Sequence, residues 1–213
     1  MKITDACVYP YPLGDSSVRR MALEAKELGF DSIVAADTPS SEFSGIDVFS
    51  GIIIQQTAAR DIASRIKRER NHRAVVSVQA GNIGFNRAVI GLKGVHIIRG
   101  IQSADKTAFD HVTAKMAADN QVAIDLDMSP LISGRGITRQ RAIQRYRDIL
   151  VLERRFEFPL TISSHAHSIL EMRAVRDIVG ICSSIDMEIT DIKMAFSGVD
   201  TVTSPPANAV KVI

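Results

Sequence analysis

The alternation of short apolar runs with helix-type stretches constrains the fold of this chain more than any other feature. The apolar runs are rich in Ile, Val and Ala, and we predict strands at 2–8, 32–36, 48–55, 74–78, 95–98, 122–126 and 160–163. Helical spacing of apolar residues predicts helices between them, at 15–29, 57–70, 86–92, 107–120, 138–155, 168–182 and 186–196. Apolar strands that alternate with helices are typical of a parallel sheet covered on both faces. The sequence therefore predicts an α/β fold with about seven strands.

Repeated strand–helix units favour either a closed (β/α) barrel or an open doubly wound sheet, because the same local pattern serves both. The chain has 213 residues and shows no linker or internal repeat, which suits one sizeable core. We predict a single domain over residues 1–203. Residues 204–213 begin with Ser204-Pro205-Pro206 and are predicted to form a C-terminal tail.

Composition excludes several classes of protein. No apolar run reaches the roughly 18 to 20 residues that span a bilayer, and the N-terminus lacks the long apolar stretch of a signal peptide. Two cysteines, Cys7 and Cys182, are too few for a disulfide framework or a zinc knuckle, and each has apolar neighbours. We therefore expect a cytoplasmic protein with no membrane partner and with both thiols reduced and buried.

The positive charge is concentrated in two segments, although the formal net charge of the chain is only +2. Residues 60–73 hold six basic and two acidic side chains, and residues 135–155 hold seven arginines against two acids. Arginine, with its planar fork, suits phosphate better than lysine does. These segments indicate either a face that attracts a polyanion or ordinary solvated helix faces.

On the predicted helix 138–155, Arg141 and Arg145 flank one side of the apolar stripe, and Arg147 and Arg154 flank the other. Aromatic residues make up 5% of the chain and there is no Trp, so stacking platforms for bases are few. Any nucleic acid is therefore expected to be recognised through its backbone and shape, with strong salt dependence.

Polar residues follow several predicted strands, where active sites of (β/α) barrels lie. The sharpest enzyme hypothesis is a metal site, for which the candidate ligands are His165, His167, Asp5, Asp37, Asp125 and Asp127. The sequence has no Gly-x-Ser-x-Gly elbow, Walker loop or dinucleotide-binding glycine motif. Two enzyme alternatives stay open, a metal-dependent phosphoesterase and a small-molecule barrel enzyme with a phosphorylated substrate.

The order and spacing of motifs between residues 99 and 187 resemble those of a known family. The motifs are Asp110-His111-Val112, residues 114–117 and 120–124, Ser129-Pro130-Leu131-Ile132, and residues 158–164, 166–168 and 172–178. Together they are similar to the archaeal ribonuclease P protein component 3 family, whose eukaryotic counterpart is the thirty-kilodalton subunit of RNase P and RNase MRP. The N-terminal half is looser, with residues 5–8, 25–30 and 86–88 alike.

This resemblance implies a TIM-barrel-like (β/α) barrel of about seven to eight strands, related to the PHP phosphoesterases. It implies a subunit of the endoribonuclease that removes the 5′ leader of precursor tRNA. The catalytic centre would belong to RNA with its Mg²⁺ ions, and the protein itself would have no cofactor, metal ligand or catalytic residue. The implied partners are RNase P RNA, precursor tRNA through the holoenzyme, the small RRM-like RNase P protein subunit and other RNase P proteins.

One departure from the PHP relatives supports a protein without a catalytic centre of its own. Those phosphoesterases carry His-x-His at the end of the first strand, where this chain has Cys7-Val8-Tyr9. The resemblance therefore indicates a barrel that has lost its metal centre. Matched by position, the RNA-contact candidates are Arg87, Arg99, Lys115, Arg139, Arg141, Arg145, His167, Arg173 and Arg176.

Overall fold

The structure is a computed structural model that describes residues 2–55, 58–69 and 74–204. Its strands are β1 (Thr4–Val8), β2 (Ser32–Ala36), β3 (Ser41–Phe43), β4 (Ile46–Ile54), β5 (Val75–Gln79), β6 (Ile97–Arg99), β7 (Ala123–Asp127) and β8 (Leu160–Ser163). Its α-helices are α1 (Val18–Glu27), α2 (Ala59–Glu69), α3 (Ile83–Ile90), α4 (His111–Asp119), α5 (Ser129–Ile132), α6 (Ile137–Phe156), α7 (Val175–Ser184), α8 (Ile189–Phe196) and α9 (Gly198–Thr203). The described residues also include the 3₁₀ helices η2 (Lys106–Ala108) and η3 (Ile169–Glu171).

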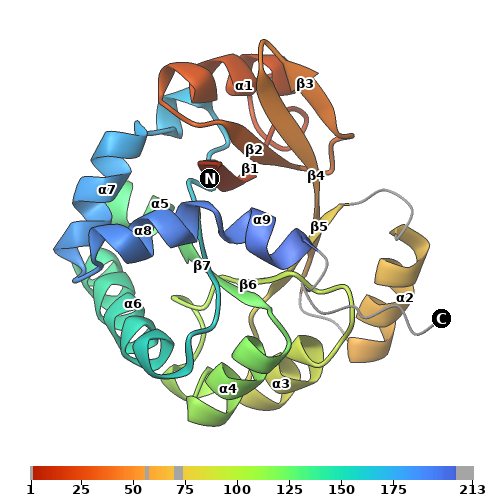
Figure 1. The fold of residues 1–213 in the computed structure, drawn as a ribbon, viewed down its shortest axis with the longest axis vertical. Helices are drawn as coiled ribbons and strands as arrows, with labels where there is room; N and C mark the ends of the chain where they lie inside the picture. Colours follow the sequence, from red (N-terminus) through yellow and green to blue (C-terminus); the bar gives the residue numbers. More distant parts are fainter. Residues whose placement is uncertain (1, 56–57, 70–73, 205–213) are drawn as a thin grey trace.

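The strands curve into a barrel, most helices lie around it, and α9 lies across one end (Figure 1). The order is β1-β2-β4-β5-β6-β7-β8, all pairs along this path are parallel, and β3 adds an antiparallel hairpin to β4. The ends meet through a parallel bridge between Val8 and Ala166, with the Tyr9 amide donating to the Ala166 carbonyl at 2.8 Å. The predicted fold class, a TIM-barrel-like (β/α) barrel, is therefore confirmed.

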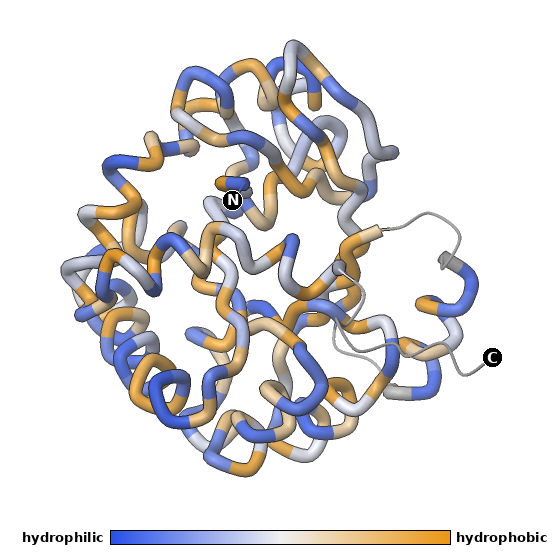
Figure 2. Tube along the Cα trace, in the orientation of Figure 1, coloured by the Kyte–Doolittle hydropathy of each residue, from blue (hydrophilic) through white to orange (hydrophobic). Residues whose placement is uncertain are grey.

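Apolar residues on the outer side of the strands pack against the helices and form the main core. In Figure 2, hydrophobic colour repeats along the strands, and hydrophilic colour alternates with it around the outer helices. A smaller apolar cluster fills the lower part of the barrel, where Val199 of α9 meets Ala6, Val75 and Ala123 from the first halves of their strands. A Cβ added at Gly198 would lie 1.9 Å from the Leu160 carbonyl oxygen, so glycine allows α9 to approach β8.

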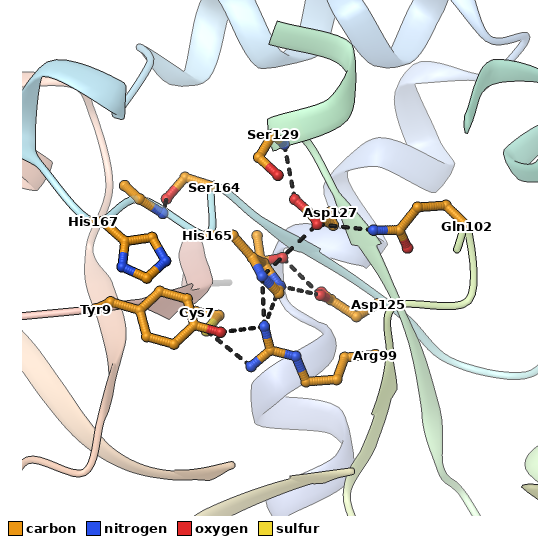
Figure 3. A network of polar contacts seen from close by, with 12 residues as sticks. Cys7, Tyr9, Arg99, Gln102, Asp125, Asp127, Ser129, Ser164, His165 and His167 are labelled. Carbon is orange, nitrogen blue, oxygen red and sulfur yellow. Dashed lines mark hydrogen bonds and ion pairs between the residues drawn. The ribbon is translucent and has the colours of Figure 1, made fainter. Parts of the chain in front are cut away.

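The upper part of the barrel interior is polar. Arg99 on β6 and Asp125 and Asp127 on β7 point inward at the carboxyl ends of their strands (Figure 3), and Thr161 and Ser163 on the neighbouring strand β8 bond to Asp125. The residues that alternate with them, Ile98, Leu126 and Ile162, are buried in the main core. Because side chains along a strand point alternately to the two faces, one short segment supplies both the core and the polar interior.

Several predicted helices have different limits in the structure. The predicted helix 107–120 divides into η2 and α4, because the Asp110 side chain accepts from the Thr113 amide at 2.9 Å and caps a new helix. The predicted helix 168–182 likewise divides into η3 and α7. Helix α6 matches its prediction within one residue at each end, and α5, α9 and β3 were not predicted.

Both cysteines are free and buried, as expected. In the described part of the chain, no helix has the length and apolarity needed to cross a bilayer. The predicted limit of the domain at residue 203 stays a prediction, because residues 205–213 of the predicted tail lie outside the described residues.

Candidate functional site

The buried guanidinium of Arg99 lies at the centre of the polar interior (Figure 3). Arg99 ends β6 and is only 5% exposed. Its Nη2 donates to the Tyr9 hydroxyl and to His165 Nδ1, the latter at 2.5 Å. Its Nη1 lies 3.6 Å from Cys7 Sγ, within the range of a weak hydrogen bond to sulfur. One cation therefore joins β6 to β1 and to the loop after β8.

Asp125 supplies an anion to this network. Its carboxylate accepts from the hydroxyls of Thr161 at 2.9 Å and Ser163 at 2.7 Å, and from His165 Nε2 at 3.0 Å. Burial alone would raise the pKa of Asp125, but the hydrogen bonds from His165 and Ser163 and the charge of Arg99 outweigh burial. The net result is a lowered pKa, so Asp125 is a carboxylate at neutral pH.

Asp127, two residues further along β7, is held by separate contacts. One carboxylate oxygen accepts from the Ser129 amide at 2.8 Å, and the other accepts from Gln102 Nε2 at 2.8 Å. The Asp127 carbonyl accepts from the Tyr146 hydroxyl at 2.7 Å, which ties the end of β7 to α6. Asp127 therefore fixes the start of α5 at the barrel mouth.

The tautomer of His165 follows from its partners. A guanidinium has no acceptor, so His165 Nδ1 must accept from Arg99, and Nε2 must carry the proton that is donated to Asp125. The 3.8 Å between Nδ1 and the Asp127 carboxylate then joins two acceptors and is no hydrogen bond. His165 has a backbone φ of +52°, with its amide donating to the Cys7 carbonyl at 3.0 Å. This turn points the ring into the barrel.

Asp5 lies fully buried beside this network. Its Oδ1 accepts from the amides of Ser164 at 2.9 Å and Cys7 at 3.2 Å, and its Oδ2 has no hydrogen-bond partner in the described chain. Burial raises the pKa of Asp5 to about 6, against the lowering effect of the Ser164 contacts.

The network pairs most of its polar groups internally, although Arg99 Nε and Gln102 Oε1, like Asp5 Oδ2, have no hydrogen-bond partner in the described chain. The Arg99 charge faces Asp125, and the imidazole between them uses both nitrogens. Burial raises the pKa of the Cys7 thiol to about 12, so Cys7 is a neutral thiol and a poor nucleophile at neutral pH.

The same geometry shows which of the candidate metal ligands lie together. The structure brings Asp125, Asp127 and His165 together, but Asp37 is exposed in the loop after β2, and His167 lies on the rim of the barrel mouth. Among the described residues, no group of three His, Cys, Asp or Glu side chains could hold a metal ion. The guanidinium of Arg99 lies among the candidate ligands and would repel a cation.

Two predicted RNA contacts, Arg99 and Arg145, are interior residues in the structure. Arg145 is 7% exposed and donates to the backbone carbonyls of Ile101, Asp105 and Lys106 at 3.0–3.4 Å. Its side chain therefore holds the loop between β6 and α4 rather than facing solvent. The helical spacing placed Arg145 beside the apolar stripe, but it could not show that a loop covers that flank.

The other seven candidates are accessible to different degrees. Lys115, Arg139, Arg141, His167 and Arg176 are exposed, and Arg87 and Arg173 are partly buried. Arg87 forms a 2.7 Å ion pair with Asp110, and Arg139 Nη2 donates to the Ile132 carbonyl at 3.2 Å. Of the remaining α6 arginines, Arg147 and Arg154 both contact Asp186 after α7. Arg147, Arg154 and Arg155 are nevertheless exposed, so accessible positive charge runs along the whole of α6.

The contributions of Tyr9, Gln102 and Ser163 were missed from the sequence. The alternation in Asp125-Leu126-Asp127 and Thr161-Ile162-Ser163 could have indicated an inward polar row on two adjacent strands. Nothing in the sequence indicates that Arg99 and Tyr9, 90 residues apart, share a hydrogen bond.

Fold and site together define a class of protein, a single (β/α) barrel whose mouth is occupied by a cation–imidazole–carboxylate network. The sequence model of the family described as RNase P subunit p30 matches residues 2–202. The chain belongs to that family and is a protein subunit of ribonuclease P. The resemblance to the ribonuclease P protein family that the sequence motifs indicated is therefore confirmed.

Individual relatives agree with this assignment. The chain is 29% identical over 200 residues to ribonuclease P protein component 3 of Methanococcoides burtonii, covering 91% of this chain and 83% of the relative. Among solved structures, a chain of archaeal ribonuclease P with mature tRNA has a TM-score of 0.77 at 22% identity, covering 93% of this chain and 89% of that one. The ochratoxinase of A. niger shares the fold alone, with a TM-score of 0.65 at 8% identity and coverage of 97% and 72%.

Proposed function

We propose that this chain supports the catalytic RNA of ribonuclease P through its basic surface and contributes no catalytic group. The surface consists of Arg87, Lys115, Arg139, Arg141, His167, Arg173 and Arg176. The observation that carries the proposal is the position of Arg139 and Arg141 in the first half of α6. In the described part of the chain neither forms an ion pair, whereas Arg147 further along the helix pairs with Asp186 at 2.9 Å.

The arrangement of helices supports a continuous contact. Helix α3 packs beside α4, and α4 packs beside α6, so Arg87, Lys115 and Arg141 lie on successive helices around the barrel (Figure 1). Cations on neighbouring helices can follow a phosphate backbone over several nucleotides. RNase P RNA is the polyanion that such a subunit would meet.

The polar interior supports the non-catalytic part of the proposal. The interior side chains able to act as acid, base or nucleophile include His165, Asp125 and Cys7. Asp125 and Cys7 are buried, His165 is only 10% exposed, and all three are bonded to one another or to Arg99. We propose that the Mg²⁺ ions of the reaction are held by the RNA. The protein would work in the cytoplasm with a small RRM-like partner subunit and other RNase P proteins, and it would meet precursor tRNA through the holoenzyme.

The test is the salt dependence of RNA binding. The double variant Arg139→Ala with Arg141→Ala should lower the slope of log K against log salt concentration by about 1.4 to 1.8, because two phosphate contacts are lost. Reconstituted assemblies with RNase P RNA would be titrated at several salt concentrations, with Arg147→Ala as the control from the same helix. An unchanged slope in the double variant, with native circular dichroism, would contradict this assignment of the surface.

A further inference from the structure

The rim of the barrel mouth carries a stacked pair of rings. The His167 imidazole lies over the Tyr9 ring with centroids 4.2 Å apart and planes 6° from parallel. Tyr9 is fixed from below by Arg99, whose guanidinium bonds to its hydroxyl and lies 5.5 Å from its ring centroid. Two rings held in parallel form a platform onto which a further flat group can stack.

The backbone around His167 holds the imidazole in place. The His167 amide donates to Glu171 Oε2 at 2.7 Å, and His167 Nδ1 lies 3.1 Å from the Leu13 carbonyl oxygen. A carbonyl only accepts, so Nδ1 carries the proton and Nε2 keeps a lone pair. Because His167 is exposed, this acceptor is available to a ligand.

A pocket of about 290 Å³ adjoins this platform. Besides the two rings, its lining includes the polar residues Ser129, Ser133 and Arg173 and the apolar residues Ile132 and Leu170. Ordinary small-ligand pockets begin at about 300 Å³. The space therefore suits one nucleotide-sized group and excludes a helix of either protein or nucleic acid.

Arg173 supplies a cation to the pocket. Its Nη1 donates to the carbonyls of Leu170 at 2.9 Å and Met172 at 2.7 Å, which anchors one end of the guanidinium. In the described chain its Nε and Nη2 make no hydrogen bond, so a fork of donors is left for an oxyanion. The opposing charge in the lining is Glu171, whose carboxylate already accepts the His167 amide.

We propose that this pocket binds a single unpaired nucleotide of RNA, with the base stacked on His167 and the phosphate at Arg173. The proposal rests on the proposed function, because it assumes that the chain meets RNA. A platform of polar rings, two hydroxyls and a guanidinium is the combination by which proteins hold splayed-out bases. It also modifies the expectation from composition, since one of the few aromatic residues, Tyr9, is already stacked with His167 at an open mouth.

The first experiment is a footprint of His167 with diethyl pyrocarbonate, which modifies unprotonated imidazole nitrogens. The full-length protein is treated alone, with RNase P RNA, with precursor tRNA, and with the other protein subunits but no RNA. Mass spectrometry then measures modification of the peptide that contains residues 164–173. We expect one of the two RNAs to lower the rate at His167 at least about fivefold, as loss of access by stacking implies.

The second experiment maps the contact in the assembled enzyme. Holoenzyme is reconstituted with 4-thiouridine in either RNase P RNA or precursor tRNA, irradiated, and searched for nucleotides linked to Tyr9 or His167. His167→Ala should reduce the crosslink at Tyr9 about fivefold or more, and His167→Phe, which keeps a flat ring, should restore it. Thr190→Ala, an exposed substitution on α8 outside the pocket, serves as the control.

The outcomes separate this proposal from the function on which it rests. Protection and crosslinking by either RNA support the nucleotide pocket and identify its source. Protection by the protein subunits without RNA overturns it and makes the pocket a protein contact. An active holoenzyme with neither protection nor crosslink also overturns it, while leaving the role as an RNase P subunit intact. An inactive assembly that fails to bind RNA would instead count against the proposed function.

Discussion

Replacing Arg99 by methionine should destabilise the barrel strongly. The substitution keeps an unbranched apolar stem but removes the cation from a site that is 5% exposed. Asp125 and Asp127, which are 2% and 6% exposed, would then be two buried carboxylates with no cation of the network beside them. Tyr9 would lose its guanidinium donor, and His165 Nδ1 would lose its partner.

The magnitude follows from the cost of an unpaired buried charge. Removing one partner of a buried ion pair typically costs 3–5 kcal/mol, and the retained stem offsets part of this through packing. We expect the free energy of unfolding to fall by about 3–4 kcal/mol. Because a chain of this size has a urea m-value of about 2–3 kcal/mol/M, the midpoint should fall by about 1–2 M.

A matched pair of variants tests the electrostatic origin of the loss. Arg99→Lys keeps the charge but cannot bond to Tyr9 and His165 with a planar fork, so it should cost less, about 1–2 kcal/mol. In the double variant Arg99→Met with Asp125→Asn, the second substitution removes a charge that the first left unpaired. Urea denaturation followed by circular dichroism should therefore show a favourable coupling of about 1 kcal/mol or more.

Acid unfolding gives an independent check, because the lowered pKa of Asp125 fixes the direction in which stability changes with pH. The pKa of Asp125 is lowered in the folded protein, so its contribution to stability is present above pH about 3.8 and is lost as pH falls through the folded pKa. Without Arg99 that pKa should rise, and acid unfolding should begin at a higher pH. A loss below about 1 kcal/mol in Arg99→Met at pH 7, or additive effects in the double variant, would refute the internal-cation reasoning.

Three further predictions concern individual residues. Arg145→Ala should lower the free energy of unfolding by about 2–3 kcal/mol in urea denaturation, because three carbonyls lose a buried donor. Arg141→Ala should change it by no more than about 0.5 kcal/mol. Equal losses in the two variants would contradict the burial argument. The pKa of Asp5 is raised to about 6, so the ionisation of Asp5 lowers the free energy of unfolding of wild type as pH rises from about 4 to 6. Relative to wild type, the free energy of unfolding of Asp5→Asn should therefore increase by roughly 2–3 kcal/mol over that pH range. A difference between the two proteins that does not change with pH in denaturation experiments would count against this assignment. His165→Gln retains a donor and an acceptor, so single-turnover cleavage of precursor tRNA by the holoenzyme should change less than about threefold, whereas loss of a general base costs 10²-fold or more.

Much of the barrel could be predicted because apolar strands are a strong local signal. The run Leu160–Ser163 was predicted with the limits that β8 has in the structure. The helix limits were less predictable where a polar residue interrupts a helical pattern, as Asp110 does by capping α4. Strand β3 was missed because Ser41–Phe43 is mostly exposed, and its pairing with β4 depends on a hairpin rather than on apolar burial.

The site was harder to predict because the direction in which each side chain points decides which residues form it. His165 and His167 are two residues apart and would share one face of an extended strand. The positive φ of His165 breaks that rule, so His165 joins the buried network and His167 stacks on the rim. Arg99 presented the same difficulty, since a charge at the end of an apolar strand is compatible with either face of the sheet.

The orientation of Arg99 supports the proposal that this barrel serves RNA without doing chemistry of its own. In a closed barrel the inward acidic residues at the strand ends need a partner for their charge. Here that partner is the side chain of Arg99. Because Arg99 bonds to the imidazole and the imidazole bonds to the Asp125 carboxylate, the buried positive and negative charges offset one another within the chain. The groups that remain accessible, the His167 ring and the arginines of the rim and of α6, are of the types with which proteins contact phosphates and bases. In the proposed function, the interior therefore contributes rigidity and the surface contributes recognition.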